Sequence, residues 1–150
     1  MRSSEEFSEV SKRGVADHLL EAAVAALLDR SDALSAIVLG GSAEDVYQGL
    51  LKLQDDKGPS AREELAKDVI AIAGALYPDE PAMTDRRAFD AIRGTFNWLR
   101  HNDRAEDQQT RVINATLEAA AIVERAMFNQ HLLSGREHPR MQELLRLMRC

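Results

Sequence analysis

The chain is poor in cysteine and in aromatic residues, with one cysteine, one tryptophan and 5% aromatic residues in all. Because Cys150 is the only cysteine, no disulfide can form within the chain, and a reducing cytoplasmic location is expected. The opening stretch MRSSEEFSEVSKR lacks the apolar segment of a signal peptide. The sequence also lacks any run of about 18 apolar residues, so we expect no membrane-spanning helix.

The sequence also lacks the short motifs that mark metal and nucleotide sites. It contains no HExxH, CxxC, GxGxxG or P-loop lysine motif. The four histidines form no i, i+4 pair, and the paired Glu-x-x-His pattern of di-iron bundles is absent. We therefore expect neither a metal nor a cofactor.

Lysine is scarce as well, since the basic residues are 15 arginines and 4 lysines. The net charge of −6 argues against a broad surface that coats nucleic acid. A local basic patch is still compatible with this charge, and arginine suits paired contacts with phosphates or carboxylates. At 150 residues, 45% of them hydrophobic, the chain fits a single domain spanning 1–150, with frayed ends at 1–5 and 149–150.

Apolar residues recur at helical spacing, and no alternating strand pattern is present. The sequence predicts an all-α fold, an antiparallel up-and-down bundle of about five helices plus a short C-terminal helix. The expected helices span 5–30, 33–54, 61–76, 84–100, 108–133 and 140–148. In the first of them, the expected core stripe is Val15, Leu19, Ala22, Ala26 and Leu27.

Residues typical of helix ends mark most of these boundaries. Ser31 and Asp32 predict a tight turn and a cap for the second helix. Ser60 and Glu63 have the spacing of a capping box. The pair Ser134-Gly135 predicts the end of the long helix.

The second helix carries two adjacent glycines, Gly40 and Gly41, each of which costs roughly 1 kcal/mol in a helix relative to alanine. We expect them to permit close approach of another helix, near Ala119 and Ala120 of the long helix. Glu44 and Asp45 follow directly. Either they form a solvated face, or one of them pairs with an arginine of the stretch 84–104.

That stretch, TDRRAFDAIRGTFNWLRHNDR, is the most basic part of the chain, with five arginines and three aspartates. On a helix, Arg93, Asn97 and Arg100 lie along one flank of the apolar face, and His101 and Arg104 continue the row. Such a row has two interpretations. It is either a phosphate-binding surface or a surface helix whose arginine stems cover apolar neighbours.

Two features predict association between copies of the chain. Trp98 points away from the apolar face of its helix. The long helix 108–133 has an unusually wide apolar surface made of two stripes. We expect a homodimer that buries Trp98 and part of the long helix.

Two segments together resemble a known family. Leu39-Gly40-Gly41-Ser42-Ala43-Glu44-Asp45-Val46 is followed later by Asn97-Trp98-Leu99-Arg100-His101-Asn102-Asp103. This combination is similar to bacterial helical proteins of the HEPN superfamily. The resemblance implies a compact, commonly dimeric helical bundle. Many HEPN domains are metal-independent endoribonucleases, often toxins, while others accompany nucleotidyltransferases.

The family site is an arginine, four to six residues and a histidine, and here Phe96 stands where the arginine is expected. Arg93, one turn earlier, is the possible substitute. The resemblance implies a dimeric regulatory module that binds RNA or a nucleotide through Arg93, Asn97, Arg100 and Arg104, with Glu44 in support. Alternatively, the chain is an active ribonuclease that uses His101 as acid and base. A third possibility is a module that binds only a partner protein.

Overall fold

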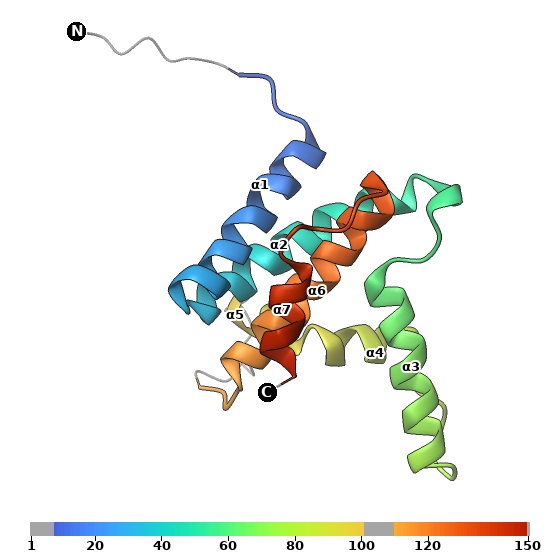
Figure 1. The fold of residues 1–150 in the computed structure, drawn as a ribbon. Helices are drawn as coiled ribbons and strands as arrows, with labels where there is room; N and C mark the ends of the chain where they lie inside the picture. Colours follow the sequence, from blue (N-terminus) through green and yellow to red (C-terminus); the bar gives the residue numbers. More distant parts are fainter. Residues whose placement is uncertain (1–7, 101–109, 150) are drawn as a thin grey trace, which may run out of the picture.

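The computed structural model describes residues 8–100 and 110–149 of the chain (Figure 1). His101, Arg104 and Cys150 lie outside the described residues. The described part is helical and contains no strand, which confirms the predicted all-α fold. Its elements are α1 (Lys12–Val24), the π-helical turn η1 (Ala25–Asp29), α2 (Ala33–Lys52), the short 3-10 turn η2 (Asp55–Lys57), α3 (Ala61–Leu76), α4 (Asp85–Ile92), α5 (Gly94–Arg100), α6 (Ala115–Ser134) and α7 (Met141–Met148).

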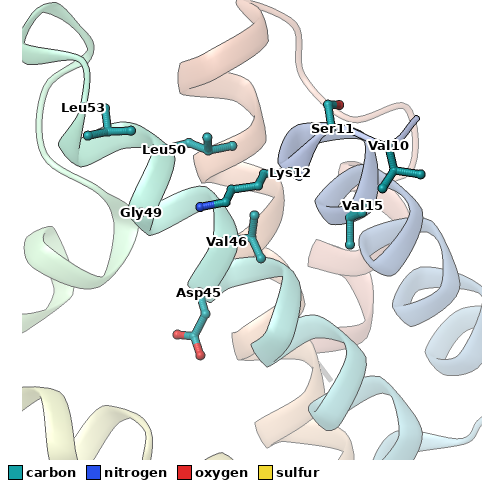
Figure 2. Close-up of a pocket in the computed structure, with 9 residues that line it drawn as sticks. All are labelled: Val10, Ser11, Lys12, Val15, Asp45, Val46, Gly49, Leu50 and Leu53. Carbon is teal, nitrogen blue, oxygen red and sulfur yellow. The ribbon is translucent and has the colours of Figure 1, made fainter. Parts of the chain in front are cut away.

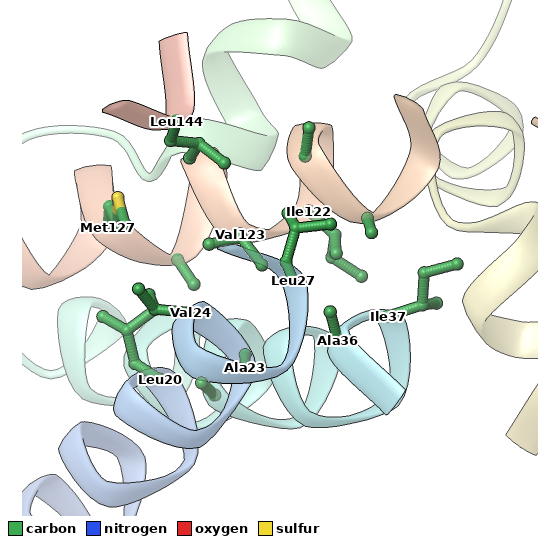
Figure 3. Packing of buried hydrophobic residues seen from close by; sticks show 14 of the residues in the cluster. Leu20, Ala23, Val24, Leu27, Ala36, Ile37, Ile122, Val123, Met127 and Leu144 are labelled. Carbon is green, nitrogen blue, oxygen red and sulfur yellow. The ribbon is translucent and has the colours of Figure 1, made fainter. Parts of the chain in front are cut away.

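Helix α2 is the centre of the fold, because it packs against both α1 and α6 (Figure 1). Helix α7 lies on α6, while α3 and α4 pack together at one side of the bundle. Apolar side chains of α1, α2, α6 and α7 meet in one core (Figure 3). Among its fully enclosed members are Leu20, Ile37, Val123, Met127 and Leu144.

The core face of α1 differs by one residue from the predicted stripe. Val15 is 40% exposed, whereas Ala16 and Leu20 are fully buried. Helix α1 has alanines on more than one of its own faces. The spacing of apolar residues alone therefore does not show which face is buried. The π turn then adds a residue to the helical repeat and places Leu27 in the core.

Side-chain caps fix where the helices begin. Asp32 and Ser60 each accept a hydrogen bond from the backbone N–H three residues later, as predicted. Glu63 does not complete the capping box, since it accepts from Gln48 instead. Gly135 ends α6 in the left-handed conformation, with φ of 73°.

Three predicted boundaries were wrong. The first helix begins at Lys12, after the Ser11 cap, rather than near residue 5. The helix predicted over 84–100 is two helices, because the backbone leaves helical geometry at Arg93, directly before Gly94. The long helix begins at Ala115 rather than at 107–108, since Asn114 caps it by accepting from Leu117 N–H. Val112 therefore precedes the helix and is fully exposed.

The two glycines of α2 lie at close contacts, as predicted. A β-carbon on Gly40 would lie 3.1 Å from Val123 and 3.3 Å from Ile122 of α6. The contact with the long helix is thus confirmed, about one turn beyond Ala119 and Ala120. Gly41 faces a different neighbour, Phe96 of α5.

Helix α7 is attached to the bundle by polar contacts at its start. Arg140 donates to both carboxylate oxygens of Asp29, at 2.7 and 3.0 Å, and to both oxygens of Glu143, at 2.9 Å. His138, which is buried, lies with its Nε2 2.6 Å from Glu21 of α1. These contacts position Leu144 over the core.

Candidate functional site

The site begins with two neighbouring acids on α2. Glu44 follows Gly40 by one helical turn and lies on the same inward face, and its side chain is completely buried. Asp45 is turned further outward, and 29% of its side chain is exposed. A buried carboxylate is costly unless cations and hydrogen-bond donors surround it, so Glu44 requires such partners.

Two arginines from different helices provide those partners. Arg125 of α6 donates from Nε to Glu44 Oε2 at 2.8 Å. Arg62, in the first turn of α3, places Nη2 3.2 Å from Glu44 Oε1. Both side chains are about nine-tenths buried, since 11% of Arg62 and 10% of Arg125 is exposed. Glu44 therefore joins α2, α3 and α6 at one buried point.

Asp45 binds three arginines at once. Arg62 Nη2 lies 2.8 Å from Oδ1, and Arg93 Nη2 lies 2.8 Å from the same carboxylate. Arg100 Nη1 reaches Oδ2 at 3.2 Å. One of the two alternatives for this acidic pair is therefore confirmed, because Asp45 pairs with arginines of the basic stretch. Glu44 and Asp45 are not a solvated face.

We call Glu44, Asp45, Arg62, Arg93, Arg100 and Arg125 the arginine–carboxylate cluster. Among the described residues, its ion pairs join four guanidinium groups to two carboxylates, which leaves a surplus of two positive charges within this set. Burial lowers the pKa of Arg93, the nearby Arg62 lowers it further, and Asp45 and Glu44 oppose both effects. In the same part of the chain, the Nε atoms of Arg62 and Arg93 are buried without a hydrogen-bond partner, and so is Glu44 Oε1, although Arg62 Nη2 lies 3.2 Å from that oxygen. The positive character of the cluster therefore follows from its charges and not from its unpaired atoms.

Phe96 forms the apolar floor beneath the outer arginines. The guanidinium carbon of Arg93 lies 4.7 Å from the ring centroid, and that of Arg100 lies 5.7 Å from it. The ring is 2% exposed and rests against Gly41. In place of the arginine that the family pattern expects, the chain has a buried ring that supports two other arginines.

Among the described residues, the cluster has an exposed edge near the break between α4 and α5; we call it the open edge. Arg100 keeps 53% of its side chain exposed. Arg111 is exposed as well, and its Nη2 would lie 2.9 Å from a β-carbon on Gly94. Because Gly94 has no side chain, the Arg111 guanidinium can lie against the backbone there. The two exposed arginines therefore flank the same short segment.

The structure brings three predicted site residues into one cluster, while His101 and Arg104 lie outside the described residues. Arg93 and Arg100 meet at Asp45, as described, and Asn97 lies half-buried on α5. Glu44 lies in the same cluster, although its own partners are Arg62 and Arg125. Sequence reasoning missed both of these arginines. Arg125 carried one available signal, since an arginine directly before the apolar pair Ala126-Met127 of an alanine-rich helix needs an acid if it is buried.

A groove of about 410 Å³ borders the cluster between the start of α1 and the second half of α2. Figure 2 shows Asp45 with its carboxylate directed away from Val10 and Val15, while Lys12 extends toward Gly49. The walls of this groove are mainly aliphatic. It therefore offers little to a charged ligand, and the guanidinium groups of the cluster meet the carboxylate of Asp45 instead.

Within residues 8–100 and 110–149, no three His, Cys, Asp or Glu side chains lie where they could hold a metal ion. In the same part of the chain, no helix has the length and apolar character needed to cross a membrane. The cluster's described contacts involve arginine, carboxylate and Phe96, so its evident chemistry is electrostatic. Comparison of the chain with family models, curated proteins and solved structures finds no match.

Proposed function

We propose that the chain is a HEPN-like module that binds RNA or a nucleotide through the phosphate, at the open edge of the arginine–carboxylate cluster. One observation carries the proposal, namely the surplus of guanidinium over carboxylate in a partly buried cluster. Arg100 is its exposed member, and Arg111 lies across Gly94. A phosphate between them would balance the positive charge that Asp45 and Glu44 leave uncompensated.

The cluster would act by preorganisation. Asp45 and Phe96 hold Arg100 from two sides, so less side-chain freedom is lost when a phosphate binds. Asn97, half-buried, lies one helical turn before Arg100 on the same helix. The net charge of −6 keeps the remaining surface unfavourable for RNA, which would restrict binding to this edge.

Binding of a labelled single-stranded RNA, measured by fluorescence anisotropy against salt concentration, tests the proposal. Arg100→Ala and Arg111→Ala should each weaken binding by about 1–3 kcal/mol, the range for hydrogen bonds to charged groups. Each should also reduce the slope of log K against log salt by about 0.7. Arg136→Ala, which removes an exposed arginine far along the chain, is the matched control and should change neither quantity.

Two results would overturn the proposal. The first is an absence of RNA binding by the unaltered protein even at low salt. The second is cleavage of the RNA by the unaltered protein and loss of that cleavage in His101→Ala, which would replace a binding module by a ribonuclease.

We also propose that the module is a homodimer in which Trp98 is buried. Helix α5 carries Leu99 beside a shallow apolar groove that Leu34, Val38 and Leu39 of α2 complete. Leu34 is 52% exposed and Val38 is 44% exposed. The apolar surface of the long helix is largely covered by α1, α2 and α7 of the same chain. The surface around Trp98 is accordingly our choice for the dimer contact.

A further inference from the structure

Only part of the surface of helix α3 is packed against the rest of the protein. Arg62 and Ala66 are its buried residues, and they face the body of the bundle. On another side, Leu65, Ile72 and Leu76 recur at spacings of seven and four, so they share one face. Ile72 is 60% exposed and Leu76 is 66% exposed. An apolar stripe therefore runs along α3, whose far end stands away from α2 and α6 (Figure 1).

At its other end this stripe runs into a groove of about 370 Å³ between α3, α6 and α7. This volume falls within the ~300–1,000 Å³ typical of ligand pockets. Leu65, Phe128 and Met148 form its apolar lining, and Phe128 is 42% exposed. A phenylalanine left open beside two other apolar side chains offers a place for large apolar groups of a partner.

Carboxylates surround this groove. Glu64 and Asp68 line it from α3, one turn apart, and Glu124 lines it from α6. Lys67 lies 3.5 Å from Glu64 and offsets part of that charge. Arg125 also lines the groove, but its Nε is already bonded to the buried Glu44. The rim is therefore negative, above an apolar floor.

We propose that this surface, the groove with the stripe along α3, binds a basic amphipathic helix of a partner protein. The apolar floor fits the apolar face of such a helix, and the rim pairs with its lysines or arginines. From Ala61 to Leu76, α3 is about 22 Å long at 1.5 Å per residue, room for a partner helix of about 15 residues. This surface is separate from the open edge of the arginine–carboxylate cluster, where the RNA would bind.

Two labelled synthetic peptides of about 15 residues are suitable probes. Both carry leucines at helical spacing, and the flanking positions are arginine in one peptide and glutamate in the other. By fluorescence anisotropy, the full chain should bind the arginine peptide with micromolar affinity that weakens as salt rises. The glutamate peptide should bind at least tenfold more weakly.

Matched pairs of variants locate the binding surface. Phe128→Ala should weaken binding of the arginine peptide about tenfold, whereas Leu53→Ala, at an 82% exposed leucine outside this surface, should leave it unchanged. Asp68→Lys should weaken binding at least fivefold, and Asp90→Lys, at an exposed acid on α4, should not. Circular dichroism and thermal melting of each variant verify that the fold is retained.

Equal binding of the two peptides, or equal loss in the variants and their controls, would overturn the proposal. So would conversion of a dimer to a monomer by Phe128→Ala or Asp68→Lys in sedimentation, because the occupant would then be a second copy of this chain. Arg100→Ala should leave peptide binding intact, so failure of the RNA-binding proposal is distinguishable from failure of this one.

Discussion

Gly41 and Phe96 occupy complementary positions, since a β-carbon on Gly41 would lie 2.2 Å from Cδ2 of the Phe96 ring. No real side chain fits at that distance, so the ring lies where only a glycine leaves room. Through this contact α5 approaches α2 closely enough for Arg93 and Arg100 to reach Asp45. The site therefore depends on a glycine that carries no chemistry itself.

Substitution of Gly41 by alanine should destabilise the fold, because the methyl group would displace Phe96. We expect a loss of about 1–3 kcal/mol in the free energy of unfolding, the range for overpacked cores. Gly49→Ala in the same helix is the control, since no atom lies within 4 Å of its β-carbon position. There the better helix propensity of alanine should add up to about 1 kcal/mol. Urea unfolding measures both, and a neutral Gly41→Ala would contradict the packing described.

Glu44→Gln should be among the most destabilising polar substitutions in the chain. It leaves Arg62 and Arg125 nearly buried without their carboxylate, and breaking a buried pair in this way costs about 3–5 kcal/mol. Glu137→Gln, at an exposed glutamate, should change the free energy of unfolding by less than about 0.5 kcal/mol. If both variants unfold at the same urea concentration, Glu44 does not hold the three helices together.

Acid should weaken the attachment of α7. Hydrogen bonds from Arg140 lower the pKa values of Asp29 and Glu143 below their ordinary 3.8 and 4.5. Because these pKa values are lower in the folded protein, the contribution to stability is complete above pH 4.5 and is lost as the pH falls through the lowered values. The melting temperature should thus fall less steeply with acid in Arg140→Met than in the unaltered protein. Parallel profiles from pH 7 to pH 3 would show that the three residues contribute no pH dependence.

The homodimer proposal predicts that Val38→Asp produces monomers. A carboxylate placed among Leu34, Leu39 and Leu99 would have to lose its hydration in the dimer contact, whereas in a monomer it stays in water. Analytical ultracentrifugation at micromolar concentration gives the mass, and Trp98 fluorescence should shift to longer wavelength in the variant. Leu53→Ala is the control. A monomeric unaltered protein with solvent-like Trp98 emission would contradict the proposal.

The helices were predictable because their local signals agree. Asp32 and Ser60 are caps whose short side chains can satisfy free N–H groups in any fold, and Gly135 adopts the left-handed conformation that favours glycine. The face of α1 was not predictable, because alanine fits several faces equally well. The break at Arg93 had a visible signal in Gly94, but a glycine inside an apolar pattern is compatible with either a break or a close contact.

Of the candidate site, the sequence indicated only the part that is local. Arg93 and Arg100 lie on one basic stretch. An ion pair between this stretch and Glu44 or Asp45 was one of two open alternatives, because both acids directly follow the apolar, glycine-containing segment of α2. The bond from Arg125 to Glu44 spans 81 residues, and no spacing rule connects positions so far apart. What determines it is the packing of α6 on Gly40, a tertiary contact that buries Glu44 and so requires a cation.

Asp45 binds Arg62 at the start of α3 and Arg93 at the end of α4. Both ends of the hairpin that these two helices form are therefore attached to the same carboxylate of α2. In terms of chain topology, 61–93 behaves as an insertion with adjacent ends. Segments of this kind are the ones that proteins lengthen, shorten or exchange while the remaining core keeps its connections. The hairpin carries the apolar stripe, so the α3 part of the proposed binding surface can diverge through this segment while α1, α2, α6 and α7 retain their packing.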